Sequence, residues 1–511
     1  MVPTAIIQGV AAFGTEQPTG PDGNGRPLAY RVVRGSLWLA LSSYFQLVWG
    51  FGANLILTRL LEPQHFGTYA LALFWFSLLN LRPKLGIGQA FAQRKETTPE
   101  LAGTHLTLDL TAGLVTLLLL GAAVPVLIGL GYPPELGWVV LALGAVGLVE
   151  AAGATAIILL DKNLLFHRSA LVQGLAFGAS YLPGFWVALN GGGYWSIVVQ
   201  NAALAALTTL GTWWAARGLP AAAVRRWRFD PRLARELIRF GLVVGMATLG
   251  AMFLTQLDNF LVGTFVGLAA LGFYDRAYRT AQWPANLLNV VVNRGAFYTY
   301  ARLRDDPARL HRTGTMLLWL ILMGGIPLAI AVAIAAPELI TVLYGDRWLP
   351  VAPILRLLVV YSVCRPLWDN AASLFTALGR PGLNTVFTAA QAVILAAAGL
   401  PLTLLWQTTG TALAMGLAFG LGLALTYREV LRQTGINLGA ELRPAALAGA
   451  AIGAGYWLLS GLPLLGGLGV EARLGLKFGY AFGGFWLLAV GLSPRLVLGR
   501  LGYVIRLLRA D

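Results

Sequence analysis

Long apolar runs, separated by short polar segments, fill most of the chain after the first 35 residues. A membrane-spanning helix needs about 20 predominantly apolar residues, and this rule predicts an all-α, polytopic membrane protein with about 14 transmembrane helices. The segment 278–297 is the least apolar of them, because it contains Pro284 and several Asn residues. The predicted spans are 36–58, 66–86, 103–130, 136–159, 168–189, 194–216, 240–266, 278–297, 314–336, 350–377, 382–405, 409–428, 445–461 and 474–492.

The basic residues between these runs predict the orientation of the chain. An even number of spans leaves both ends on one side. If that side is cytoplasmic, 29 of the 37 Lys and Arg residues fall in cytoplasmic segments, Arg82 and Lys84 among them. Cytoplasmic loops of membrane proteins are enriched in Lys and Arg. The sequence therefore predicts a multi-pass protein of the inner (plasma) membrane with both termini in the cytoplasm.

The composition agrees with a chain whose surface faces lipid. Hydrophobic residues make up 57% and charged residues 12%, with a mean hydropathy of +0.70, whereas soluble domains carry about 25% charged residues. The net charge of +15 follows from basic loops scattered between spans. It does not form one basic domain, so nucleic acid is not an expected partner.

Two stretches of the chain repeat each other at an offset of 205 residues, which predicts two parallel six-helix lobes. The repeat predicts a lobe at 35–216, a lobe at 240–430, and two further helices with a cytoplasmic tail at 431–511. Parallel repeats are a transporter architecture, with the substrate path between the halves. The matching pairs are Arg34 and Arg239, Asn54 and Asn259, Gly67 and Gly272, Tyr69 and Tyr274, and Ala72 and Ala277.

Two segments outside the lobes have polar compositions. Residues 1–34 are rich in Gly and Pro and predict a disordered cytoplasmic tail with no cleavable signal. The linker 217–239 is strongly basic, and a basic amphipathic helix resting on anionic membrane lipids is its expected form. The segments exposed on the outer side are short, so no extracytoplasmic catalytic domain is expected.

Several motifs resemble those of a known transporter family. The run from Leu57 to Ala70, LTRLLEPQHFGTYA, resembles the end of the first helix of polysaccharide flippases in the multidrug/oligosaccharidyl-lipid/polysaccharide exporter superfamily. Similar stretches are LDKNLLF at 160–166, LDNFLVG at 257–263 followed by LGFY at 271–274, and ALGRP at 377–381. The resemblance covers roughly residues 35–430.

The resemblance implies a cargo and a mechanism. The cargo would be a polyprenyl-pyrophosphate-linked oligosaccharide, carried from the cytoplasmic to the outer face by alternating access for cell-surface polysaccharide or lipopolysaccharide biosynthesis. Other polysaccharide-assembly proteins would be partners. A lipid II flippase and a drug or metabolite exporter of the same superfamily stay open as alternatives. A membrane glycosyltransferase or polymerase is disfavoured, since the outer segments hold few carboxylates.

Arginines within or beside spans are the candidates for holding the pyrophosphate. Charges inside a membrane are costly and usually functional, and guanidinium groups stay charged and bind phosphate bidentately. A structural ion pair and interfacial anchoring are the competing explanations for them. The candidates are Arg365 and Arg356 in the span 350–377, and Arg59, Arg276 and Arg279 near the outer ends of spans.

Three acidic residues within spans are candidates for ion coupling: Asp258, Glu150 and Asp369. Pairing with an arginine is the competing explanation, and for Asp369 that arginine is Arg365, four residues earlier on one helix face. No cofactor or metal is expected. Cys364 is the single cysteine, and the four histidines lie far apart in the chain.

Overall fold

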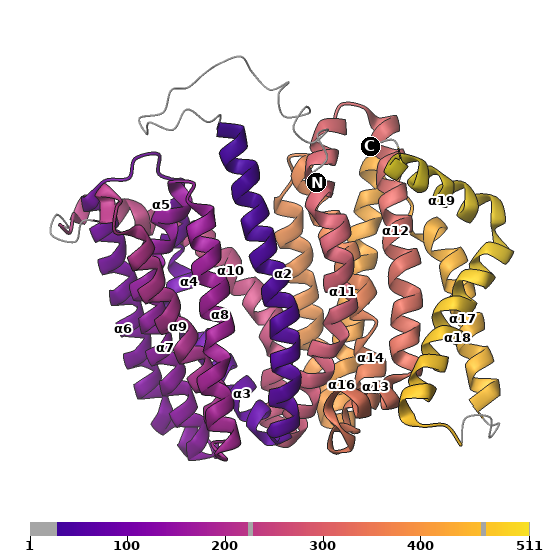
Figure 1. Ribbon diagram of the computed structural model, residues 1–511, viewed down its shortest axis with the longest axis horizontal. Coiled ribbons are helices and arrows are strands. Elements are labelled where there is room, and N and C mark those ends of the chain that lie inside the picture. The colour runs from indigo at the N-terminus through magenta and orange to yellow at the C-terminus, as the bar shows by residue number, and fades with distance from the viewer. Residues whose placement is uncertain (1–27, 223–227, 461–466, 510–511) are drawn as a thin grey trace. The chain divides into compact units, whose positions relative to one another are not determined.

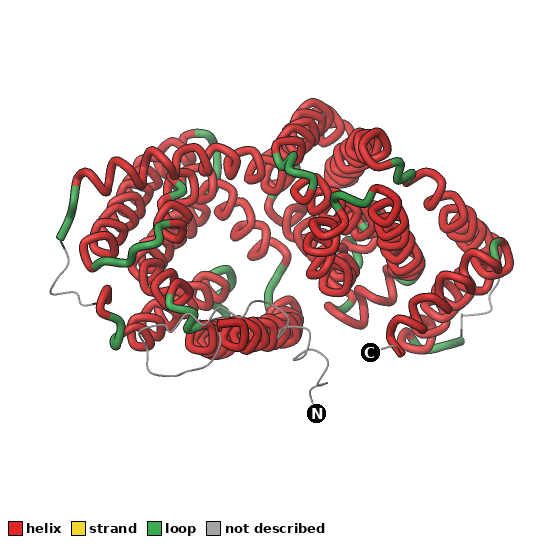
Figure 2. Tube along the Cα trace, turned by 90° about the horizontal axis from the view of Figure 1, so that it is seen from above, coloured by secondary structure: helices red, strands yellow, loops and turns green. Residues whose placement is uncertain are grey.

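The structure, a computed structural model, describes residues 28–222, 228–460 and 467–509, which are helices and connecting loops without a strand (Figures 1 and 2). The predicted tail up to residue 27, and Arg225 and Arg226 of the basic linker, lie outside the described residues. Each predicted span overlaps a helix. Within the described part of the chain, six helical segments are long and apolar enough to cross a membrane: 99–129, 134–162, 307–334, 351–377, 382–434 and 470–492. The count of 14 spans stays a prediction.

The chain forms two compact units. Among the described residues, unit 1 comprises 28–60, 75–222, 228–248 and 507–509, and unit 2 comprises 61–74, 249–460 and 467–506. Among the described helices, three therefore cross the division: α3 (Pro63–Leu79), α10 (Pro231–Phe265) and, in its last residues, α19 (Pro494–Arg509). α10 begins inside the predicted basic linker and continues without interruption into the next predicted span.

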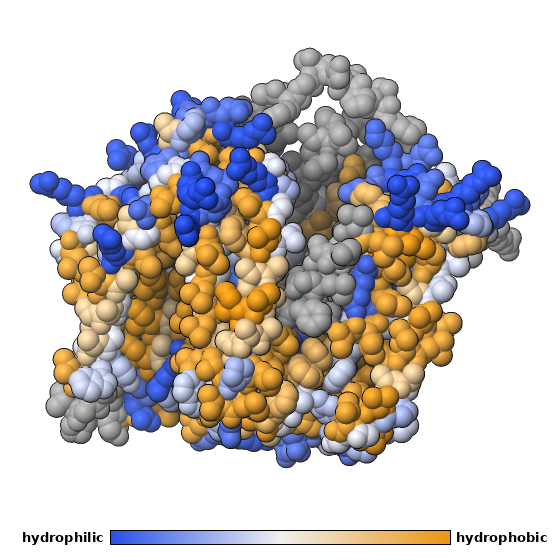
Figure 3. All heavy atoms as spheres, turned by 180° about the vertical axis from the view of Figure 1, so that it is seen from behind, coloured by the Kyte–Doolittle hydropathy of each residue, from blue (hydrophilic) through white to orange (hydrophobic). Residues whose placement is uncertain are grey.

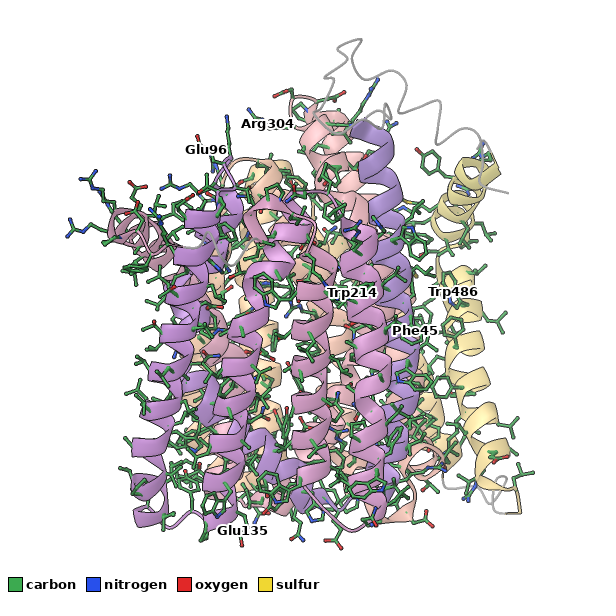
Figure 4. All side chains as sticks on the ribbon, turned by 60° about the vertical axis from the view of Figure 1, so that its left-hand side comes forward. Phe45, Glu96, Glu135, Trp214, Arg304 and Trp486 are labelled. Carbon is green, nitrogen blue, oxygen red and sulfur yellow. The ribbon has the colours of Figure 1, made fainter. Side chains whose placement is uncertain are left out.

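Unit 1 is a bundle in which α6 packs on α7, α9 packs on both α7 and α8, and α2 packs on α8. Glu96 and Glu135 lie at opposite ends of this bundle, so these charges sit where apolar helices end (Figure 4). Its helices are α2 (Leu28–Leu60), α4 (Leu81–Leu85), α5 (Ile87–Gln93), α6 (Pro99–Gly129), α7 (Pro134–Lys162), α8 (Phe166–Leu189), α9 (Trp195–Ala216) and the 3-10 turn η1 (Pro220–Ala222).

The predicted span 66–86 is broken in the structure. α3 ends at Leu79, Asn80 caps α4 by accepting a hydrogen bond from the Arg82 backbone N–H, and Gly86 takes a left-handed conformation before α5. The break packs against α10, where side chains on Gly241 and Gly245 would overlap the Leu85 and Lys84 carbonyl oxygens. Glycine is required here because the two backbones meet directly.

Unit 2 is built around α11, which packs on α12, α14 and α15, while α12 also packs on α17 and α18. α16 holds two predicted spans, and its backbone leaves the helical region at Trp406 and Gln407, in the turn between them. The further helices are α11 (Leu268–Leu303), α12 (Pro307–Ile334), α13 (Ala336–Tyr344), η3 (Asp346–Trp348), α14 (Val351–Leu358), α15 (Tyr361–Ala377), α16 (Gly382–Thr434), α17 (Leu438–Ser460), α18 (Val470–Leu492) and α19 (Pro494–Arg509).

Hydrophobic residues cover the middle of the face drawn in Figure 3, and hydrophilic residues gather toward the helix ends. Many large apolar side chains are exposed, among them Leu175 at 70% and Leu487 at 77%. A surface of this kind is stable against lipid, where every backbone group of a helix is already hydrogen-bonded. The fold is therefore that of a membrane protein with several spans.

A reciprocal contact joins α3 to α11 inside unit 2. A Cβ on Gly67 would overlap the Leu268 carbonyl oxygen, and a Cβ on Gly272 would overlap the Pro63 carbonyl oxygen. Both glycines and both carbonyls are related by the offset of 205. A two-fold relation between two copies would produce such an exchange, and the parallel repeat of two six-helix lobes stays a prediction.

We expect Gly67→Ala and Gly272→Ala each to lower the stability of the purified protein by about 1–3 kcal/mol, the usual cost of overpacking. The added methyl group in each case meets backbone, which cannot rotate away. Gly420→Ala is the control, because nothing lies within 4 Å of its Cβ position. Thermal unfolding in detergent measures the difference. Equal stability of all three variants would contradict the contact.

Candidate functional site

A pocket of about 380 Å³ lies within unit 2, among α3, α10, α11 and α15. Its wall is mostly polar, which is unusual for the interior of an apolar helix bundle. Neutral hydrogen-bonding groups predominate, and two arginines and one aspartate add charge. The lining residues are Ala70, Leu73, Thr255, Gln256, Asn259, Asp275, Tyr278, Arg279, Gln282, Asn286, Tyr361 and Arg365.

Asp275 is shared by two arginines with different environments. Its Oδ2 accepts hydrogen bonds from Arg276 Nη2 at 2.7 Å and Arg279 Nε at 2.9 Å. The Arg276 side chain is 6% exposed, and its guanidinium lies over the Phe66 ring at 4.1 Å. The Arg279 side chain is 45% exposed and lines the pocket. Arg276 therefore balances a buried carboxylate, while Arg279 presents its charge to the pocket.

Arg365 enters the same pocket from α15. Its Nε donates to Asp369 Oδ2 at 3.1 Å, which confirms the predicted pairing across one helical turn. Asp369 does not line the pocket, whereas Arg365 does and remains 40% exposed. Arg365 is thus both ion-paired and open to the pocket, so the two explanations weighed from the sequence are not exclusive.

Two other predicted arginines lie elsewhere. Arg356 is on α14, separated from α15 by a break at Val359–Val360, and its Nε donates to the Ala333 carbonyl oxygen at 3.2 Å. Arg59 is exposed at the end of α2, in unit 1. Neither belongs to the pocket lining. Of the five predicted substrate-binding arginines, the pocket brings together Arg279 and Arg365.

Asp258 is buried behind the pocket, at 1% exposure. Its Oδ2 accepts a hydrogen bond from the Tyr274 hydroxyl at 3.1 Å, and its Oδ1 accepts one from the Asn259 backbone N–H at 2.9 Å. Both donors are neutral, so the predicted competing explanation, pairing with an arginine, does not describe these contacts. The next residue, Asn259, lines the pocket.

Glu150 belongs to a separate charged cluster in unit 1. Arg82 Nη2 and Nε bond the two Asp109 carboxylate oxygens at 2.9 and 3.1 Å, and Arg82 Nη1 bonds the Gly147 carbonyl oxygen at 3.0 Å. Glu150 Oε2 is 3.6 Å from Nη1, and the Glu150 side chain is 55% exposed. The cluster has two carboxylates and one guanidinium, and Glu150 is the carboxylate that Arg82 holds less closely.

The placement of Arg82 corrects the sequence interpretation, which put it in a cytoplasmic loop. Asp109 lies ten residues into α6, about 15 Å along the helix axis at 1.5 Å per residue. The break between α3 and α5 brings Arg82 to that depth. Asp109 was missed by sequence reasoning, although an aspartate within the apolar run 103–130 is the signal that could have revealed it.

Among the residues that the structure describes, no three His, Cys, Asp or Glu side chains come together in a way that could hold a metal ion. Cys364 is buried within α15. The chemistry available in the pocket is hydrogen bonding and charge pairing, by guanidinium, amide and phenol groups. Such groups can bind an anion or a polyol reversibly.

Comparison with solved structures identifies the fold. The chain is similar to a lipid II flippase MurJ in an inward closed conformation, with a TM-score of 0.72 at 13% identity, covering 90% of this chain and all of that one. It is also similar to an inward-facing multidrug resistance MATE family transporter of the MOP superfamily, with a TM-score of 0.57 at 15% identity, covering 78% and 96% of the two chains. At these identities the similarity concerns the fold alone.

Curated relatives come from bacterial polysaccharide biosynthesis. TuaB, a teichuronic acid biosynthesis protein of Bacillus subtilis (strain 168), is 26% identical over 58% of this chain. The chain spans about three fifths of that relative's length, 61%. WzxC, a lipopolysaccharide biosynthesis protein of Escherichia coli (strain K12), is 22% identical over 70% of this chain and 73% of its own length. ExoT, a succinoglycan biosynthesis transport protein of Rhizobium meliloti (strain 1021), is 24% identical over 65% and 66%.

A family model described as "Polysaccharide biosynthesis protein" matches residues 56–353, more than half of the chain. The match contains the predicted flippase motifs at 57–70, 160–166 and 257–274, and it includes the pocket arginine Arg279. The chain therefore belongs to this family of polysaccharide biosynthesis proteins.

Proposed function

We propose that this chain is a flippase that carries a polyprenyl-pyrophosphate-linked oligosaccharide from the cytoplasmic to the outer face of the inner membrane. Its relatives are named for the biosynthesis of teichuronic acid, lipopolysaccharide and succinoglycan, and one of them is named a transport protein. The superfamily fold supports alternating access as the mechanism. The chain binds and releases its cargo without a covalent reaction.

The observation that carries this proposal is the meeting of Arg279 and Arg365 in one pocket from two different helices. Moving a pyrophosphate from water into hydrocarbon costs desolvation free energy, and this cost grows as the dielectric constant falls. The attraction between the pyrophosphate and a nearby positive charge grows in the same way, so fixed positive charge can offset the cost. Each guanidinium is already oriented by one carboxylate, Asp275 or Asp369. A phosphate oxygen can therefore bind to donors whose side-chain geometry is fixed in advance.

The neutral wall of the pocket supports a sugar as the remainder of the headgroup. Amides donate and accept together, as sugar hydroxyls require, and Asn259 and Gln256 already bond each other at 3.1 Å. The Tyr278 and Tyr361 rings lie 5.3 Å apart and offer flat apolar surface beside the polar groups. Pockets that bind small ligands commonly combine apolar surface with a few placed polar groups.

The wider arrangement belongs to the same proposal. We propose 14 spans, with two six-helix lobes within 35–216 and 240–430 and with both termini in the cytoplasm. We also propose that the basic linker contacts anionic lipids and that the chain contacts other polysaccharide-assembly proteins. If Arg82 and Lys84 are no longer counted in a cytoplasmic loop, the number of Lys and Arg residues assigned to the cytoplasmic side falls by two from 29. The excess of positive residues on that side remains large.

We propose Glu150 as the group that couples transport to a proton. Its nearest cation, Arg82, is already doubly bonded to Asp109. The Glu150 side chain is exposed within a helix of apolar sequence, and a carboxylate exposed there requires water beside it because contact with lipid would be costly. Asp369 is held by Arg365, and Asp258 is enclosed, so neither has the same access in this conformation. The α9 helix packed against α7 brings no titratable side chain between 195 and 216.

The pocket predicts that Arg279→Gln and Arg365→Gln each weaken binding of farnesyl pyrophosphate by about ten- to a hundredfold. That range corresponds to a lost charge-assisted hydrogen bond of about 1.5–3 kcal/mol. Thermophoresis with the purified protein measures it. Surface polysaccharide restored to a flippase-null strain measures transport in the same variants.

Two variants serve as controls for this measurement. Arg356→Gln should bind like the unaltered protein, because Arg356 is outside the pocket. Arg365→Ala combined with Asp369→Ala should recover stability lost in Arg365→Ala alone, since the unpaired carboxylate is removed, but should not recover binding. Unchanged affinity in an Arg279→Gln/Arg365→Gln double variant would remove the pocket from the mechanism.

The coupling proposal predicts that Glu150→Gln abolishes the dependence of polysaccharide export on external pH over the range in which the cells grow. The amide keeps the shape of the side chain but cannot accept a proton, and Arg82 keeps its bonds to Asp109, so folding should be preserved. Surface polysaccharide measured across this range in flippase-null cells reports the effect. Asp369→Asn is expected to retain the slope. A pH profile unchanged by Glu150→Gln assigns coupling elsewhere.

A further inference from the structure

The last described helix, α19, comes directly after a helix that can span the membrane. α18 is apolar enough to cross a membrane, and only Ser493 separates it from α19. α19 has 16 residues and no acidic side chain. Its length, about 24 Å at 1.5 Å per residue, is shorter than the roughly 30 Å of bilayer hydrocarbon. α19 therefore lies at a membrane face, at a slant to the spans (Figure 1).

One side of α19 is fixed to unit 2. Arg500 bonds both carboxylate oxygens of Glu441 in the first turn of α17, with Nη2 at 3.0 Å from Oε1. The same guanidinium lies 5.8 Å from the centre of the Trp319 ring on α12, and Val497 is fully buried. These contacts set the rotation of the helix about its axis and neutralise Arg500.

The opposite side of α19 carries positive charge without a carboxylate. At 100° per residue, Arg495 and Arg506 lie about 160° and 180° away from Val497. Within the described part of the chain neither forms an ion pair, and Arg506 Nε bonds only the Gly502 carbonyl oxygen of its own helix, at 3.1 Å. Leu498, 55% exposed, and Tyr503, 49% exposed, flank this basic face on either side.

We propose that this basic face of α19, defined by Arg495 and Arg506 with Leu498 and Tyr503 beside it, binds the phosphate headgroups of anionic membrane lipids. The side turned away from the protein is the side that meets lipid at the level of the headgroups. Arginine binds phosphate oxygens through paired hydrogen bonds, and a leucine and a tyrosine at that level enter the boundary between headgroup and acyl chain. Arginines near an anionic surface each contribute attraction that salt weakens.

The test uses the full chain with a Cys364→Ala background and a single reporter, Tyr503→Cys, labelled with bimane. The protein is reconstituted in vesicles of phosphatidylcholine and phosphatidylglycerol. Brominated forms of each lipid quench bimane on contact, and competition between them gives the relative binding constant at α19. We expect phosphatidylglycerol to be favoured at least about fivefold, the equivalent of one arginine at about 1 kcal/mol, and 0.5 M NaCl to reduce the ratio.

Arg495→Gln combined with Arg506→Gln should bring the ratio close to one. Arg432→Gln is the matched control, because that side chain is also exposed, at 73%, but belongs to α16 and pairs with Glu429. A second reporter, Leu498→Cys, reads the other flank and guards against a local effect of Tyr503→Cys. A ratio of one with both reporters while Arg495 and Arg506 are present, or a preference that the double variant leaves unchanged, would overturn the proposal. Neither outcome depends on transport.

Discussion

Positive charge inside an apolar helix bundle must be balanced, and the described structure is organised around that requirement. Arg82 is bonded by Asp109, Arg276 and Arg279 by Asp275, Arg365 by Asp369, and Lys477 by Glu338 at 2.6 Å. An unpaired charge in such surroundings costs several kcal/mol of folding free energy. Removing one partner of an existing pair therefore destabilises the protein more than replacing the whole pair by apolar residues. The pairs Arg82–Asp109 and Lys477–Glu338 join different helices and fix how those helices are rotated against each other. The Asp275 cluster and the Arg365–Asp369 pair each lie within one helix and orient the guanidinium groups instead.

The pairs differ in how much charge they leave for a ligand. The Lys477–Glu338 pair is nearly closed to solvent, with side chains 11% and 9% exposed. The Asp275 cluster has one more arginine than carboxylate, and its excess charge appears on the exposed member, Arg279. In the proposed binding, an anion that displaced Asp275 from Arg279 would leave the carboxylate bonded to Arg276. The exchange therefore leaves no buried carboxylate alone, which is the condition for reversible binding.

The sequence predicted the helices well, because apolar run length is a local property of the chain. It also predicted the Arg365–Asp369 pair, since four residues on one helix face determine the contact. The sequence could not show which of Arg276 and Arg279 is buried. Both lie on the same turn, and which of them is buried depends on Phe66, some 210 residues away. It missed the Arg82 cluster because hydropathy does not register a helix break that Asn80 and Gly86 produce and that Gly241 and Gly245 accommodate.

The contact between Gly67 and Gly272 would also bear on the origin of the chain if the predicted repeat arose by duplication. Each glycine receives a carbonyl oxygen from the helix that carries the other, and the two interactions are related by the same offset. In that case a single glycine in a half-length ancestor would have supplied both sides of the contact in a symmetric homodimer. After fusion, a side chain at either position would still meet backbone, so neither glycine could be replaced without the same overlap.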